Sequence, residues 1–433
     1  MALGVAGALA VVLLVGRVLA LLPAYDADVE LTRRALVVHV NHSVVVWPFA
    51  FLAGLFLLLP GVRARVRASL ALIMASVGVT AFTLLTFGQQ LPVLSNYVPV
   101  LAAPLFLSGL GAFAVGVALV LLDRARLLGV HAAPTDASNA LLQPSAQDAV
   151  RGAAIAYLCA ITTLVVTAFT IDRTLPVTEY YERLFWGCGH VLQIACVLMM
   201  LAVWDVLLHE LTGRSALARG LDQLLYVLLL LPALAAPVLV LAPHAKLQFT
   251  RMMQWGIFPM VSVVLLGTLR TLILSRATVR GRTRSPAFAA LITSISMTVA
   301  GFVVGAMIVH DTTLVPAHYH LSVGAVSVSF MGMLFVLMPR LDWSLSMSRV
   351  AFWQPLVYGA GQSVFAGGLA TAGFWGQAAR KVYGHQQVVD HFSQTIGFAA
   401  AGVGGAAAMI AGALFVLVIA RGALVGRARV GTD

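Results

Sequence analysis

The sequence predicts an all-α integral membrane protein that crosses the bilayer twelve times. Of its 433 residues, 61% are hydrophobic and only 10% are charged, whereas soluble proteins carry about 25% charged residues. The mean hydropathy is +0.96. The formal net charge of +11 reflects membrane topology, because a nucleic-acid-binding protein needs a solvated basic face that this composition does not provide. A soluble domain and a nucleic-acid partner are therefore excluded, and membrane lipid is the expected surrounding.

Twelve apolar stretches are long enough to span the hydrocarbon core, which takes about 20 residues per helix. They centre on residues 3–23, 34–59, 68–87, 98–122, 151–171, 180–208, 221–242, 249–275, 286–309, 316–338, 354–375 and 394–420. We expect residues 1–433 to form a single domain with one long surface loop at about 124–150, rich in Ala, Pro, Asp and Ser.

Basic residues predict the orientation. Most Arg and Lys residues fall in the loops on the side of both termini, so the positive-inside rule places both termini in the cytoplasm. The expected location is a cytoplasmic (inner) membrane of the bacterial or archaeal type. Three cysteines are too few for a disulfide framework or a cysteine metal cluster.

Histidines mark the candidate site, because polar side chains inside a bilayer are costly and usually functional. Imidazole is also a common ligand of iron, copper and zinc. Residues i and i+2 of a helix point about 200° apart, so His318 and His320 are expected on opposite sides of one helix. Such a helix could bind two planar cofactors, whereas one metal chelated by both side chains is disfavoured. The histidines inside or at the non-cytoplasmic ends of the predicted spans are His39, His42, His190, His244, His310, His318 and His320.

The segment from Val309 to Val326, VHDTTLVPAHYHLSVGAV, resembles the tenth helix of subunit I of heme-copper oxidases. That family carries His-Asp-Thr, then Ala-His-aromatic-His and Ser-x-Gly-Ala-Val. The resemblance implies that His318 binds a high-spin heme and His320 a low-spin heme. It also implies that His310 and Asp311 lie near the heme propionates and a Mg or Ca ion.

Other segments follow in the family's order over the whole chain. His39-Val40-Asn41, followed by Trp47, resembles helix II of nitric oxide reductases and C-type oxidases. This resemblance implies that His39, rather than His42, is the second axial ligand of the low-spin heme. Trp186-Gly187-Cys188-Gly189-His190 resembles the helix VI segment with the first ligand of the second metal, and His244 stands where the family has a His-His pair. Gly373-x-x-Gly376 with Arg380-Lys381 resembles the stretch whose basic pair binds heme propionates.

Three departures concern proton supply. Positions that carry a glutamate, a redox-active tyrosine and a channel lysine in proton-pumping oxidases hold Leu192, Ile194 and Val263. Reducing O₂ to water takes four electrons, whereas reducing two NO to N₂O takes two. The departures therefore favour reduction of NO to N₂O without proton pumping. Protons would then enter from the outer face, where Asp172, Glu179 and Glu182 cluster, although a solvated acidic loop is the more common explanation of such a cluster.

The second metal also departs from the family, because the His-His pair has become His244-Ala245. Two neutral histidines with an oxygen donor suit non-heme iron better than copper, although either metal, or none, remains open. The expected cofactors are two hemes of the b type and one non-heme iron or copper. The ligands would come from His190 and His244, with Gln193, Gln248 or Glu179 as further candidates.

Three other functions stay open. The same scaffold could reduce O₂ with another residue in place of the tyrosine, or serve as a degenerate, non-catalytic heme-binding subunit of a respiratory complex. A transporter is disfavoured, because the spans show no evident internal repeat or paired broken helices. Electrons would come from a partner subunit of the cupredoxin-like or cytochrome c type, and the substrate would be a small gas, NO or O₂.

Overall fold

The computed structural model describes residues 2–18, 29–61, 65–129, 142–242, 245–382 and 389–430. This part of the chain is almost entirely helical. Its α-helices are α1 (Ala2–Val18), α2 (Val29–Val40), α3 (Trp47–Leu57), α4 (Arg65–Leu84), α5 (Pro104–Leu121), α6 (Arg124–Leu128), α7 (Pro144–Thr170), α8 (Val177–Thr212), α9 (Arg219–Leu239), α10 (Ala245–Leu274), α11 (Arg276–Arg280), α12 (Pro286–Ala306), α13 (Leu314–Arg340), α14 (Ser348–Phe374) and α15 (Phe392–Val430). A π-helical segment, η2 (Asn41–Val46), joins α2 to α3, and a short 3₁₀ turn, η3 (Leu85–Phe87), follows α4. Two short strands, β1 (Pro92–Val93) and β2 (Val100–Leu101), pair antiparallel.

The protein is a multi-pass integral membrane protein. Within the described residues, ten helical segments are long and apolar enough to cross a bilayer. Each of the twelve predicted stretches is largely helical, but α1 and α14 are not among these ten. The apolar part of α1 is too short, from Gly4 to Val15, and glycine and glutamine dilute the hydropathy of α14. Many large apolar side chains are exposed, as expected where helices face lipid.

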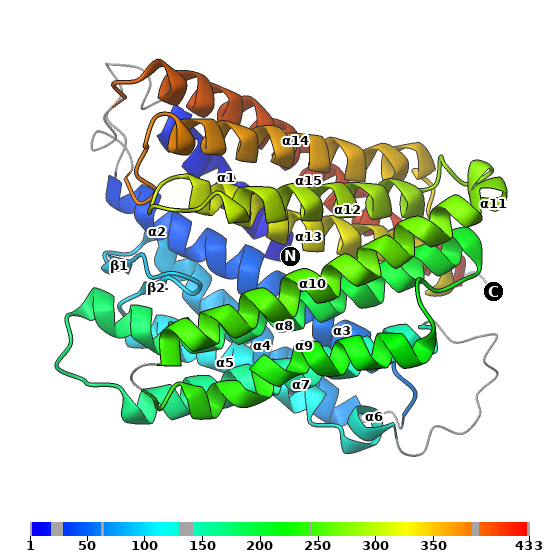
Figure 1. The fold of residues 1–433 in the computed structure, drawn as a ribbon, viewed down its shortest axis with the longest axis horizontal. Coiled ribbons are helices and arrows are strands. Elements are labelled where there is room, and N and C mark those ends of the chain that lie inside the picture. The colour runs from blue at the N-terminus through cyan, green and yellow to red at the C-terminus, as the bar shows by residue number, and fades with distance from the viewer. Residues whose placement is uncertain are drawn as a thin grey trace. The chain divides into compact units, whose positions relative to one another are not determined.

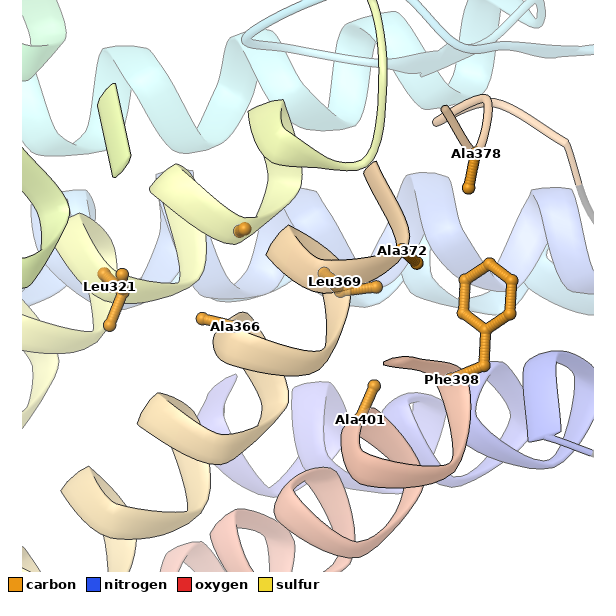
Figure 2. Close-up of a cluster of buried hydrophobic side chains, with 8 residues drawn as sticks. Leu321, Ala366, Leu369, Ala372, Ala378, Phe398 and Ala401 are labelled. Atoms are coloured by element: carbon orange, nitrogen blue, oxygen red, sulfur yellow. The ribbon is translucent and has the colours of Figure 1, made fainter. Parts of the chain in front are cut away.

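The chain divides into two compact units. Unit 1 comprises Met1–His39, Leu207–Gly213 and Ser275–Asp433. In this unit α12, α13 and α14 pack against one another, and α15 packs along α14 and α1 (Figure 1). Small side chains allow this close packing: the cluster in Figure 2 consists mainly of alanines, with Leu321, Leu369 and Phe398 filling the space between them.

Unit 2 comprises Val40–Val206 and Arg214–Leu274. Here α4 packs on α5, α7 packs on α9, and α9 packs on α10. The hairpin of β1 and β2 lies in the connection between α4 and α5. Asn41 in η2 anchors it, because its side-chain Nδ2 donates to the carbonyl of Pro99 at 2.7 Å.

Two expected boundaries are wrong. The helix expected over 98–122 begins at Pro104, because the preceding residues pair in the hairpin and proline favours the first turn of a helix. The loop expected over 124–150 is partly helical. Asp123 caps α6 and pairs with Arg126 at 2.8 Å, and Pro144 begins α7.

Candidate functional site

His318 on α13 is fixed against α12 in unit 1. Its Nδ1 lies 2.8 Å from the carbonyl oxygen of Gly301. A carbonyl only accepts hydrogen bonds, so Nδ1 carries the proton and Nε2 carries the lone pair that could bind a metal. Glycine at 305 makes room for the ring, because a Cβ there would lie 2.8 Å from His318 Nδ1. The local sequence therefore orients this imidazole.

His320 faces the other neighbour of α13. Its Nδ1 lies 3.1 Å from Oε1 of Gln362 on α14, and its ring lies 4.4 Å from that of Phe365. One histidine thus contacts α12 and the other contacts α14. The prediction that His318 and His320 face opposite sides of one helix is confirmed.

His39 and His42 have different surroundings. His39 in unit 1 lies with Nδ1 2.8 Å from the carbonyl of Ala6 on α1, so Nε2 carries its lone pair as well. His42 in unit 2 is fully buried, with Nε2 2.8 Å from Thr83 Oγ1 and its ring packed on Phe82. Thr83 and Phe82 thus hold the side chain of His42 within unit 2.

The predicted propionate region lies where the loop before α13 meets the segment after α14. Asp311 and Arg380 form an ion pair of 2.9 Å, with the Asp311 side chain 69% exposed and that of Arg380 only 11% exposed. The backbone nitrogen of Thr313 donates to Ala378 at 2.9 Å, which holds the two segments together. His310 is exposed, and Lys381 is half-buried next to Arg380.

His190 on α8 is the centre of an aromatic cluster in unit 2. Its Nδ1 lies 2.8 Å from the carbonyl of Trp186, one turn earlier, so Nδ1 is protonated. Nε2 therefore accepts from the hydroxyl of Tyr97 at 2.6 Å. The rings of Tyr97, Trp186 and Phe249 all pack against the imidazole.

Tyr97 is the residue that sequence reasoning missed. It lies between the strands of the hairpin with a φ of 67°, a conformation that is uncommon for a non-glycine residue. Glu182 on α8 holds this turn, because it accepts from the backbone nitrogen of Asn96 at 2.7 Å and from its side chain at 2.5 Å. A Cβ at Gly189 would lie 2.4 Å from the Cβ of Tyr97. Gly189, the glycine beside His190, is therefore the feature of the sequence that could have indicated a closely packed side chain at this point.

The other candidate ligands of a second metal do not gather at His190. Glu179 pairs with Arg183 at 2.5 Å, and both side chains are exposed. Gln193 is half-buried. His244 and the side chain of Gln248 lie outside the described residues. Over the described ranges, no three His, Cys, Asp or Glu side chains are placed to hold a metal ion.

The acidic residues near the start of α8 each have their own partner. Asp172, in the loop before α8, accepts from the backbone nitrogen and the hydroxyl of Thr174 at 2.8 and 2.7 Å. These two hydrogen bonds lower the pKa of Asp172. Because Glu179 pairs with Arg183 and Glu182 with Asn96, the three acids do not point into one shared proton-binding cluster.

Comparison with known proteins identifies the fold. The chain matches a heme-copper terminal oxidase, determined as a dimer by cryo-electron microscopy, with a TM-score of 0.75 and 16% identity. The match covers 96% of this chain and 84% of that one. The protein is therefore a multi-pass membrane protein with the fold of heme-copper terminal oxidases.

Two proteins with similar sequences are both uncharacterized. An uncharacterized protein of Aquifex aeolicus (strain VF5) is 26% identical over 311 residues, which covers 71% of this chain and 75% of the relative. An uncharacterized protein of Rickettsia prowazekii (strain Madrid E) is 23% identical and covers 96% of this chain and 92% of the relative. No family model matches the sequence.

Proposed function

We propose that this protein is a membrane oxidoreductase with two hemes that reduces NO to N₂O without pumping protons. The observation that carries the proposal is the arrangement on α13, where His318 and His320 face opposite neighbours and each donates its Nδ1 proton to an oxygen. Both residues thus offer Nε2 as an axial ligand, as heme iron requires. The residues fit two hemes: His318 would hold the high-spin heme, and His39 with His320 would hold the low-spin heme.

The hemes, when bound, supply the electrons and the iron that binds the gas. The chain's own residues orient them, because the hydrogen bonds of the three imidazoles fix both the tautomer and the ring plane. Arg380 is the proposed partner of a heme propionate, with Lys381, His310 and Asp311 beside it. Leu192, Ile194 and Val263 cannot carry protons, which supports two-electron reduction of NO over pumped reduction of O₂.

Reduction of O₂ to water is the second candidate, and Tyr97 is the observation that favours it. The phenol of Tyr97, hydrogen-bonded to Nε2 of His190 at 2.6 Å, could donate a proton and an electron. Ile194, which stands where the family has its redox-active tyrosine, cannot. Tyr97 comes from the α4–α5 connection rather than from α8.

The second metal has less support from the residues. His190 is its proposed ligand, yet its Nε2 accepts from Tyr97, and Glu179 is paired with Arg183. The described residues do not fit a complete site for non-heme iron or copper. A bare high-spin heme on His318 is the arrangement that the described residues support.

The proposal also includes the membrane topology of the chain and its electron-donor partner. Twelve crossings, with α1 and α14 as the additional two, and cytoplasmic termini follow from the hydropathy and charge patterns. An electron-donor subunit of the cupredoxin or cytochrome c type is the proposed partner.

Gas consumption tests the proposal. We expect the purified, heme-loaded and chemically reduced protein to consume NO rapidly and O₂ slowly when NO and O₂ electrodes are used side by side. Rapid O₂ consumption would support the alternative, and Tyr97→Phe should then slow it. Bound heme with neither activity would indicate a non-catalytic subunit, whereas absence of heme would refute the proposal.

A further inference from the structure

A row of polar side chains runs along one face of α14 in unit 1. Gln354, Tyr358 and Gln362 recur every four residues, a spacing that places them on the same side of a helix. Gln362 contacts His320, and Tyr358 hydrogen-bonds both Gln362 and Ser327 on α13. The interface between α13 and α14 thus contains a hydrogen-bonded chain that ends at His320.

Among the candidate ligands that the structure describes, His320 differs in the group that accepts its Nδ1 proton. His39, His190 and His318 each donate to a backbone carbonyl. His320 donates instead to a side-chain amide, Gln362 Oε1. A carbonyl in a helix is held by the backbone, whereas an amide can rotate and present either oxygen or nitrogen.

Tyr358 supplies the contact that orients this amide. With Gln362 Oε1 turned toward His320, the amide NH₂ is the group left to donate to the hydroxyl of Tyr358. Ser327 bonds the same hydroxyl from the neighbouring helix. These contacts favour the orientation in which Gln362 Oε1 meets the imidazole.

We propose that Gln362, held by Tyr358, is a positioning residue that sets the reduction potential of the low-spin heme through His320. A hydrogen bond from Nδ1 makes the imidazole a more basic ligand, and a more basic ligand stabilises oxidised iron. Gln362 thus keeps the potential lower than it would otherwise be. This inference rests on the proposed function, because it takes His320 as a heme ligand.

The experiment compares redox titrations of the purified, heme-loaded protein, followed by the low-spin heme absorbance. Gln362→Leu removes the acceptor and should raise the midpoint potential, with heme retained about 10- to 100-fold less tightly. Gln362→Glu keeps an oxygen acceptor and should leave the potential at or below that of the wild type. Tyr358→Phe frees the amide to rotate and should give a smaller rise.

Gln354→Leu is the matched control. Gln354 is a buried glutamine on the same face of the helix, two turns from Gln362, but its Nε2 contacts Met331 Sδ at 3.2 Å rather than the hydroxyl of Tyr358. Its replacement should leave the potential unchanged. The high-spin heme on His318 reports whether each variant has folded, so selective loss of the low-spin heme in Gln362→Leu also supports the role.

Two results would overturn the inference in distinguishable ways. If the wild type holds a low-spin heme but Gln362→Leu titrates like the wild type or like Gln354→Leu, only the role of Gln362 is wrong. If the wild type holds no low-spin heme, the proposed function fails, and the role of Gln362 fails with it.

Discussion

Replacing Gly305 by alanine tests whether the backbone of α12 positions His318. A Cβ at residue 305 would lie 2.8 Å from Nδ1 of His318 and 2.9 Å from its Cε1. Carbon atoms in van der Waals contact lie about 3.5 Å or more apart. The imidazole must therefore retreat from α12 by roughly 0.6 Å, the difference between about 3.5 Å and the 2.9 Å that separates this Cβ from Cε1.

The retreat also affects the hydrogen bond that fixes the tautomer. Gly301, the acceptor, is one turn before Gly305 on the same helix, so the Nδ1–oxygen distance would grow from 2.8 Å toward the limit of hydrogen bonding. Losing this bond costs about 0.5–1.5 kcal/mol, and overpacking costs about 1–3 kcal/mol. Alanine's higher helix propensity returns about 1 kcal/mol. The net effect is a destabilisation of about 0.5–3.5 kcal/mol, and it arises at the proposed ligand His318.

Two measurements on the heme-loaded protein check this expectation. Gly305→Ala should lower the thermal unfolding temperature and weaken or alter CO binding by the reduced high-spin heme, while the low-spin absorbance stays unchanged. Gly367→Ala is the control, because a Cβ at this exposed position of α14 has no neighbour within 4 Å. The reasoning is refuted if Gly305→Ala binds CO and unfolds like Gly367→Ala.

Three further predictions concern other groups. His39→Ala should abolish the low-spin heme spectrum and His42→Ala should retain it; the opposite pattern would exchange their roles. Gly189→Ala should displace Tyr97 from His190, seen as a loss of the tyrosine hydrogen bond in ultraviolet resonance Raman spectra, and an unchanged tyrosine band would contradict this. The pKa of Asp172 is lowered in the folded protein. The ionised carboxylate therefore stabilises the fold at pH values above the unfolded pKa of about 3.9. This stabilisation is lost as the pH falls through the lower pKa of the folded state. Asp172→Asn should therefore flatten the acid limb of the thermal stability profile, and a limb identical to the wild type would count against the hydrogen bonds.

The positions of the helices were predictable because membrane helices are selected by length and apolar content. The hairpin before α5 and the π-helical turn at Asn41–Val46 were not, because tertiary contacts determine them. Asn41 lies in a short polar stretch with His39, His42 and Ser43, and only the folded chain shows that its side chain bonds the carbonyl of Pro99. The start of α7 at Pro144 was not predicted for a different reason: the first residues of this helix are polar, and their composition resembles that of a loop.

The candidate site also contains features that the sequence predicts and features that only the folded chain shows. The opposite orientations of His318 and His320 were predictable, because helical geometry alone separates residues i and i+2 by about 200°. Tyr97 was not predictable, because it approaches His190 from a segment 93 residues away in the chain. Gly189 was visible in the sequence, but what its missing side chain accommodates depends on the hairpin.

The acceptors of the four imidazoles determine where substitution could change their chemistry. Trp186 supplies a backbone carbonyl four residues before His190 on the same helix, so almost any residue at 186 would provide the same acceptor. Similarly, Gly301 and Ala6 contribute backbone atoms, and changing their side chains alters packing rather than the acceptor itself. Of these four, His320 is the one whose short Nδ1 contact, 3.1 Å to Gln362 Oε1, is to an atom that a single substitution can delete, whereas His318 reaches the side chain of Ser322 only at 3.5 Å. If His320 binds the low-spin heme, Gln362 is therefore the position at which a point mutation can alter the heme's potential and leave the ligands and the helices in place.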